Sequence, residues 1–161
     1  MTYTPTDDEL SKGLHAVFYE IQQLAFTPML STPDAGINNA IVESRLLHVR
    51  TLLDFFEDAA KQKDDVLAVH YGFPSRPIEE VEAVYRERLN KDLAHLTYSR
   101  TRRTQSDKQW PYDRVVVPVI ERCHLFAEHV LATPSIYARI NRDDWQGLVA
   151  VLAAVRTAFE V

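Results

Sequence analysis

The stretch TDDELSKGLHAVFYEIQQLAF, residues 6–26, decides the fold class. Thr6 precedes three acidic residues, which is typical of a helix N-cap followed by a negatively charged first turn. Apolar side chains then recur every three or four residues and form one stripe of an amphipathic helix. The stripe contains Leu10, Leu14, Val17, Phe18, Ile21, Leu24 and Ala25. We therefore predict an α-helix that begins after Thr6 and ends near Phe26.

The same helical period continues along most of the chain. It predicts further helices from Asn38 or Asn39 to about Gln62, from just after Pro77 to about Arg103, from Val115 to Leu131, and from Asp143 to Glu160. A short helical turn is expected within residues 135–142. No clear strand pattern, internal repeat or flexible linker interrupts the series. We expect a single all-α domain over residues 1–161, an up-and-down bundle of four to five helices.

Composition excludes several classes of protein. The net charge is −5, so any nucleic-acid footprint must be local. The single Cys123 rules out an internal disulfide, and the four glycines form no phosphate-binding loop. No apolar run approaches the roughly 20 residues that span a bilayer, and Met1–Leu10 is too polar for a signal peptide. A cytoplasmic protein without a cofactor or a membrane partner is expected.

The most specific chemical pattern lies in the third predicted helix. Arg88, Asp92 and His95 fall within about 60° of one another on a helical wheel, at the edge of the apolar stripe. Arg88 is a permanent cation suited to a scissile phosphate, and His95 is a base that titrates near neutrality. Asp92 can orient His95 or pair with Arg88. The plainer alternative is an Arg88–Asp92 ion pair on a solvated face, with His95 as an ordinary groove residue.

Arg88 to His95 fits the R-x(4–6)-H signature of the HEPN superfamily, with six residues between the two. The segment Leu89–Thr97, and Glu43–Phe56 in the second predicted helix, also resemble an uncharacterised bacterial HEPN-like group. Leu89 stands where many active members carry a polar residue, and Asn90 follows it.

The resemblance implies an α-helical bundle, often a homodimer. In active members the paired motif forms a metal-independent endoribonuclease site, which here implies catalytic roles for Arg88 and His95. The helical spacing adds Asp92 to this catalytic group. Some members are toxins or defence proteins, so a cognate antitoxin or regulatory protein is an expected partner. Others are non-catalytic modules that bind RNA or nucleotides.

Several other polar residues are candidates for binding the substrate. Arg45 falls near the middle of the apolar face of the second predicted helix, where an unpaired charge is costly, so it is expected to reach Asp92 or a phosphate. Arg100 and Arg103 belong to a basic cluster with Tyr98 and Trp110 interleaved, a pattern that can track a phosphate backbone and stack bases. Asn90 lies on another side of its helix and is the remaining candidate. The same basic residues also suit a helix C-terminus.

Two alternative functions remain open from the sequence. The first is a non-catalytic helical interaction module whose polar groove holds a protein partner or a small anion. The second is a metal-binding bundle, because His124 with Glu121 has the i,i+3 spacing of di-iron carboxylate proteins and His95 with Asp92 repeats it. Such a site also needs carboxylates from two other helices, for which Glu20 and Glu43 are available.

Overall fold

The regular secondary structure of this chain is helical in the part that the structure describes. The computed structural model describes residues 3–57, 62–93, 98–104, 109–137 and 139–159. These residues contain helices and turns and no strand, so the predicted all-α class is confirmed. No helix among them is long and apolar enough to cross a membrane. The HEPN-like arrangement of four to five helices stays a prediction.

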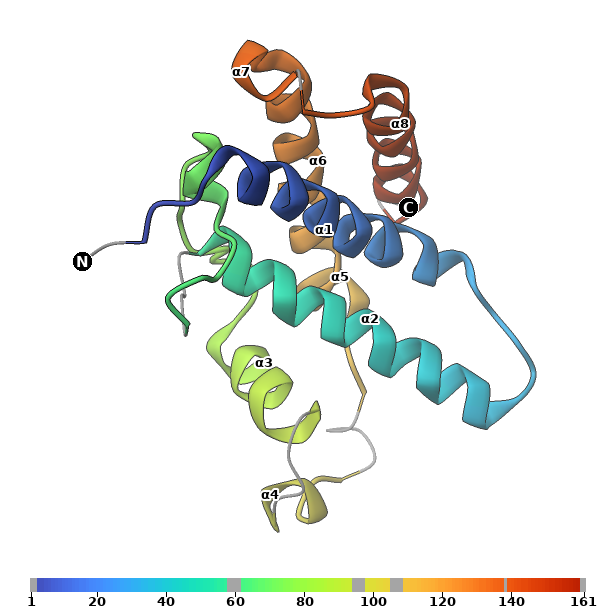
Figure 1. Ribbon diagram of the computed structural model, residues 1–161. Coiled ribbons are helices and arrows are strands. Elements are labelled where there is room, and N and C mark those ends of the chain that lie inside the picture. The colour runs from blue at the N-terminus through green and yellow to red at the C-terminus, as the bar shows by residue number, and fades with distance from the viewer. Residues whose placement is uncertain (1–2, 58–61, 94–97, 105–108, 138, 160–161) are drawn as a thin grey trace.

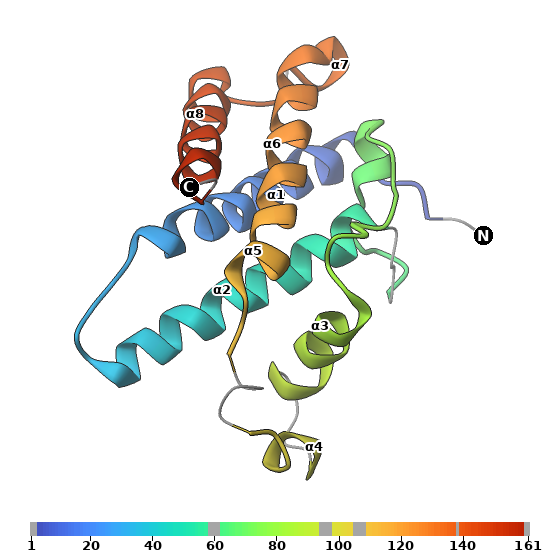
Figure 2. The same ribbon diagram turned by 180° about the vertical axis from the view of Figure 1, so that it is seen from behind.

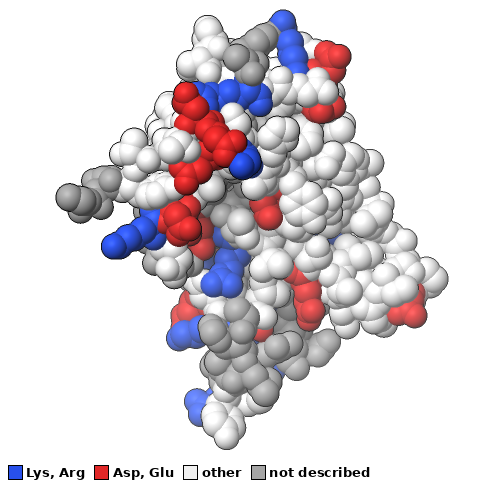
Figure 3. Space-filling view, in the orientation of Figure 1, with Lys and Arg blue, Asp and Glu red and all other residues white. Residues whose placement is uncertain are grey.

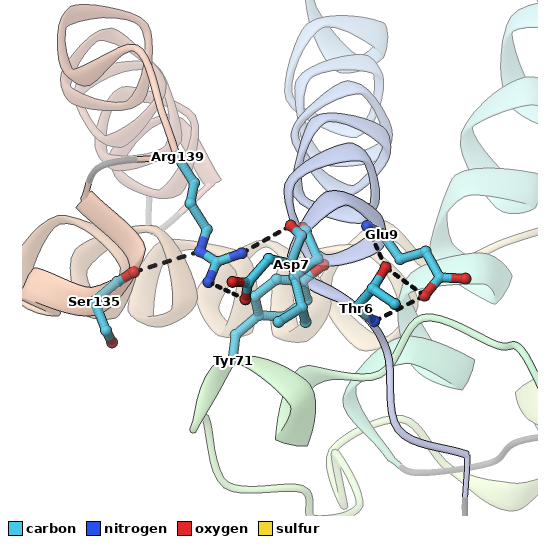
Figure 4. Close-up of polar contacts among 7 residues, drawn as sticks. Thr6, Asp7, Glu9, Tyr71, Ser135 and Arg139 are labelled. Atoms are coloured by element: carbon cyan, nitrogen blue, oxygen red, sulfur yellow. Dashed lines mark hydrogen bonds and ion pairs between the residues drawn. The ribbon is translucent and has the colours of Figure 1, made fainter.

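The first helix, α1, spans Asp7–Phe26, as predicted. Its N-terminus has the predicted cap: the backbone N–H of Glu9 donates to Thr6 Oγ1 at 3.3 Å, and the backbone N–H of Thr6 donates to Glu9 Oε2 at 2.7 Å. Figure 4 shows this reciprocal pair. A hydrogen bond from the Tyr3 hydroxyl, followed by those from Thr6, lowers the pKa of Glu9 to about 2. The local sequence therefore determines where α1 begins.

A distant arginine also holds the start of α1. Arg139 donates to the backbone oxygen of Asp7 at 2.8 Å and to its carboxylate at 2.7 Å, and it also donates to the carbonyl of Ser135 (Figure 4). One turn further along, the Tyr71 hydroxyl donates to the carbonyl of Leu10 at 3.0 Å. Residues 132 positions apart in the chain thus meet at one helix end.

The second helix, α2, spans Ala35–Phe56 and begins three to four residues before the prediction. Asp34 sets this start, because its carboxylate accepts a hydrogen bond from the backbone N–H of Ile37 at 3.0 Å. A short 3₁₀ turn, η1 (Thr27–Met29), joins α1 to α2. The predicted end at Gln62 falls after residues 58–61, which lie outside the described residues. In both views α1 and α2 run side by side as a hairpin (Figures 1 and 2).

The prediction of a continuous helix from Pro77 to Arg103 is wrong. Residues 78–82 form a loop, α3 spans only Ala83–Arg88, and a π-helical turn, η3, follows over Leu89–Leu93. After residues 94–97, which are not described, α4 spans Tyr98–Thr101. The side chain of Arg86 fixes this loop, because it donates hydrogen bonds to the carbonyls of Val81 at 2.7 Å and Ile78 at 2.5 Å. Ile78 and Val81 belong to this loop and are buried in the core, and their spacing of three residues resembles that of a helix.

The C-terminal part follows the prediction closely. α5 (Tyr112–Val115) leads into α6 (Val117–Ala132), α7 (Pro134–Tyr137) is the expected short turn, and α8 spans Arg142–Phe159. Before α3 the chain passes through a 3₁₀ turn, η2 (Ala68–Tyr71), and then a connecting loop. Figures 1 and 2 both show α6 and α8 side by side, crossing the α1–α2 hairpin at a steep angle, with α3 below α2.

One hydrophobic cluster joins all four long helices. Phe126 of α6 lies at its centre and is fully buried. Its ring meets Phe55, Phe56 and Phe73 edge-on, with centroids 5.1 to 5.9 Å apart. Such rings supply large apolar areas with a preferred geometry, so they fix the crossing of the two helix pairs. Cys123 is buried in the same cluster, and burial raises the pKa of its thiol, so it is an inert core residue.

Candidate functional site

Arg88 is a buried cation at the end of α3. Only 5% of the residue is exposed, although arginine is normally a surface side chain. Its guanidinium lies over the ring of Trp110, with 4.0 Å from Cζ to the ring centroid, and it donates to the carbonyl of Gln109 at 3.0 Å. Tyr85, one turn earlier, lies 5.8 Å from the same Cζ. The charge is therefore held by an aromatic face and a backbone oxygen.

Asp92 supplies the negative charge at this site. One carboxylate oxygen, Oδ2, lies 3.7 Å from Arg88 Nε and 2.5 Å from Arg103 Nε. The carboxylate is 9% exposed, so water screens these two contacts only weakly. The predicted i,i+4 pair of Arg88 and Asp92 is therefore present, but it is buried and shared with Arg103. The alternative of a solvated ion pair is wrong.

The π-helical turn η3 carries Asp92 at this position. A π-turn widens the helix by one residue per turn, and such turns occur frequently at functional sites. Leu89 and Asp92 of this turn are buried, while Asn90 and Lys91 are exposed. The widened turn thus separates two inward side chains from two outward ones over only five residues.

A hollow of about 380 Å³ opens beside the paired charges. Two cations and two aromatic rings line it, together with smaller groups: Val84, Tyr85, Arg88, Arg103, Gln109, Trp110 and Pro111. The volume is at the lower end of the range for small-ligand pockets. Guanidinium groups bind phosphate oxygens, and aromatic faces stack on nucleobases. The hollow therefore has the chemistry to hold a nucleotide unit.

Not every predicted site residue joins this hollow. Asn90 points away from it and accepts a hydrogen bond from Arg50 Nε at 3.1 Å. Arg45 does not reach Asp92: it donates to the carbonyl of Thr27 at 2.7 Å and lies 5.4 Å from the ring centroid of Tyr112. Burial lowers the pKa of the Arg45 guanidinium and raises that of the Tyr112 hydroxyl. Arg45 thus ties α2 to η1 and α5.

Two predicted residues cannot be compared with the geometry. His95 lies outside the described residues, and so its predicted role stays a prediction. Arg100 is in α4, but its side chain is also outside the description.

The sequence places Trp110 in the basic and aromatic cluster, but its pattern does not predict that Gln109 and Trp110 return to Arg88 from the other side of the hollow. Both residues lie in the segment between α4 and α5. A tryptophan followed by proline in that segment was the available signal. Tyr112, two residues after Trp110 in the sequence, instead packs on Phe159, with ring centroids 4.1 Å apart.

The metal-binding alternative needs a cluster of ligands. In the described part of the chain, no group of three or more His, Cys, Asp or Glu residues could hold a metal ion. His124 pairs with Glu128 at 3.6 Å, and Glu121 lies 4.0 Å from Arg156. Glu20, a candidate carboxylate, is hydrogen-bonded to His48 at 2.7 Å. A metal site that uses His95 stays a prediction.

Comparison of the chain with protein-family models, curated proteins and solved structures gives no match.

Proposed function

We propose that the protein binds RNA at the Arg88 hollow and cleaves it without a metal ion, as its resemblance to HEPN domains implies. The observation that carries this proposal is the pairing of Arg88 and Arg103 beside two aromatic rings in one hollow. Two cationic donors can bind a phosphodiester, and an aromatic face beside them can stack on the neighbouring base. An overall acidic protein that binds RNA needs such a local site.

Each residue has a distinct role in this proposal. Arg88 and Arg103 bind the scissile phosphate and stabilise the charge that develops on it during cleavage. His95 takes the proton of the ribose 2′-hydroxyl or returns one to the leaving oxygen. Attack by the internal hydroxyl leaves a 2′,3′-cyclic phosphate. Asp92 holds the two guanidinium groups in place before RNA arrives, and Trp110 offers its ring to a base.

A second candidate is the non-catalytic interaction module that holds a small anion or a protein partner. One observation favours it: the guanidinium of Arg88 is already engaged by Trp110, the Gln109 carbonyl and Asp92. A cation so engaged serves structure as well as binding, and His95 would then be dispensable. The homodimer, the antitoxin-like partner and the cytoplasmic location also belong to the proposals.

The test is an RNA cleavage assay in EDTA with purified protein. We expect wild type to produce 2′,3′-cyclic ends and His95→Ala to lower the rate by about a hundredfold or more. Arg88→Lys keeps a cation but loses the planar fork, and we expect a loss of about tenfold or more. His15→Ala, an exposed histidine of α1, is the matched control and should cleave like wild type.

The outcomes separate the two candidates. No cleavage and no RNA binding by wild type or either variant across varied RNAs would favour the interaction module. RNA binding without cleavage, lost in Arg88→Lys, would retain the RNA site and refute the catalytic role. Cleavage that persists in both variants, with wild-type circular dichroism, would refute the assignment of the site.

A further inference from the structure

A second hollow, of about 320 Å³, lies between the loop that precedes α3 and one face of α6. Residues 76–80 supply the loop side. The helix side consists of residues spaced three or four apart along α6: Pro118, Glu121, Arg122 and Leu125. This hollow, called the Arg122 hollow below, shares no lining residue with the Arg88 hollow, so its chemistry is separate.

Arg122 is the buried cation of this hollow. Only 6% of the residue is exposed, and no carboxylate among the described residues lies within ion-pair distance of it. Its guanidinium donates from Nη2 to the carbonyl of Pro74 at 2.8 Å, while Nε is buried without a hydrogen-bond partner in the described chain. A guanidinium carries five N–H donors, so this side chain has donors left for a further acceptor. A buried cation in this condition favours an anionic oxygen beside it.

Arg76 brings a second positive charge to the same hollow. Its side chain belongs to the exposed part of the loop, whereas Arg122 is buried. Burial, and then the charge of Arg76, lower the pKa of the Arg122 guanidinium, which shows that the two cations repel each other. An anionic group that approaches both guanidinium groups relieves this repulsion.

Three carboxylates restrict the kind of anion that fits. Glu79 and Glu80 of the loop and Glu121 of α6 also line the hollow. Glu79 and Glu80 are exposed and form no ion pair with a described residue, whereas Glu121 lies 4.0 Å from Arg156 Nε. In Figure 3, positive and negative side chains lie beside one another on the side where Figure 1 places the loop before α3. Such a mixed surface repels a ligand with several negative charges, such as phosphate.

Apolar groups complete the wall of the hollow. Ile78 is buried, Leu125 is 48% exposed, and Pro77 and Pro118 also line it. The volume is at the lower end of the range for small-ligand pockets. A molecule of the size of an amino acid therefore suits the hollow better than a folded partner does.

We propose that the Arg122 hollow binds a small zwitterion, a ligand with one carboxylate and one ammonium group, as in an amino acid. The carboxylate accepts hydrogen bonds from Arg122 and Arg76, and the ammonium group lies beside the glutamates of the rim. The apolar part of the ligand contacts Leu125. This proposal uses none of the residues of the RNA site and does not depend on ribonuclease activity.

The test is a binding screen of the full chain by ligand-observed NMR. The probes are the common amino acids, one at a time, and γ-aminobutyrate. We expect at least one probe to bind with a dissociation constant below about 1 mM. Its amide lacks the carboxylate and its N-acetyl derivative lacks the ammonium group, so each should bind about tenfold or more weakly than the zwitterion. Inorganic phosphate should not compete with it.

Substitutions place the binding in the hollow. Arg122→Met should weaken zwitterion binding about tenfold or more with unchanged circular dichroism. Arg114→Met, which removes an exposed arginine outside the lining, is the matched control and should bind like wild type. A double variant, Glu80→Gln with Glu121→Gln, should lose the preference for the zwitterion over its N-acetyl derivative. If Arg122→Met loses its helical signal, Arg76→Met replaces it, because Arg76 is exposed.

Four results would overturn the proposal. The first is the absence of binding by every zwitterion up to about 10 mM. The second is inorganic phosphate that binds as tightly as the best zwitterion, which would make the hollow an unselective anion site. The third is an equal affinity in Arg122→Met and Arg114→Met, which would place the binding elsewhere. The last is a double glutamine variant that keeps the full preference for the zwitterion, which would refute the role of the rim carboxylates.

Discussion

Two arginines of this protein are buried in almost the same way, although they lie in different surroundings. Arg88 and Arg122 are 5% and 6% exposed. Each lies over an aromatic ring, Trp110 at 4.0 Å and Phe73 at 4.9 Å, and each donates to a backbone carbonyl. Aromatic packing and one carbonyl are therefore sufficient to hold a guanidinium in the interior.

The two arginines differ in the charges around them. Arg88 shares the carboxylate of Asp92 with Arg103, beside the hollow. For Arg122, no carboxylate among the described residues lies within ion-pair distance, and burial together with the nearby Arg76 lowers the pKa of its guanidinium. Arg88 thus lies with a second cation and one carboxylate beside the Arg88 hollow, whereas Arg122 has no ion pair in the described part of the chain and lines the separate hollow of about 320 Å³ with Arg76.

The largest loss of unfolding free energy is expected when the carboxylate shared by Arg88 and Arg103 is removed. Asp92→Ala leaves two cations, one of them buried, without their shared carboxylate, and breaking a buried pair costs about 3 kcal/mol or more of unfolding free energy. Urea denaturation followed by circular dichroism measures this loss. Asp8→Ala, which removes an exposed partner of Lys12, should cost less than about 1 kcal/mol. A similar cost for both variants would contradict the role assigned to Asp92.

A smaller effect is expected when each buried arginine becomes methionine. Arg122→Met leaves no carboxylate without a close partner and keeps the apolar contact with Phe73, so we expect a change within about 1 kcal/mol. Arg88→Met removes one of the two partners of Asp92, so it should be the more destabilising of the two by about 1 to 2 kcal/mol. Equal losses in urea titrations would show that the two arginines do not differ in this way.

The binding role of the hollow can be tested at its wall. Trp110→Ala removes the ring over Arg88, and one lost base stack weakens binding by about 1 to 3 kcal/mol, or at least about fivefold. Fluorescence anisotropy with a single-stranded RNA measures the dissociation constant. Trp110→Phe keeps a stacking face and should retain most of the affinity. Equal losses in the two variants would show that the ring does not stack on RNA.

The smallest effect is expected at Arg45, a half-buried arginine that lies away from the hollow. Arg45→Gln should weaken the junction of α2 with Thr27 by about 1 kcal/mol and leave RNA affinity within about twofold. The same anisotropy assay tests this expectation, with Arg88→Lys as the positive control. A tenfold loss of affinity in Arg45→Gln would extend the RNA site to α2 and would restore the role that the sequence assigned to Arg45.

Local signals in the sequence predicted some elements well. The start of α1 was predicted correctly because Thr6 and Glu9 form a cap within four residues. The Arg88–Asp92 pair was also visible, since helical spacing alone brings the two together. Their burial was not visible, because it depends on Trp110, which returns from 22 residues further along the chain.

The long third helix was predicted wrongly for a related reason. Ile78 and Val81 have helical spacing but are buried from a loop, and the contacts of Arg86 with their carbonyls cannot be read from periodicity. The shared position of Arg103 beside Asp92 likewise depends on how the chain turns after η3. Contacts set by neighbours within four residues were predictable, while those set by distant segments were not.

The contact between Arg139 and Asp7 has a consequence for how the chain folds during synthesis. While a ribosome makes the protein, the N-terminal end of α1 is synthesised before Arg139. The contact with the Arg139 guanidinium can form only after more than 130 further residues have been added. Contacts of such separation form late, because closing a long loop costs entropy before it stabilises anything. We therefore expect nascent chains that stop before residue 139 to leave this end of α1 open to proteases, and completed chains to protect it.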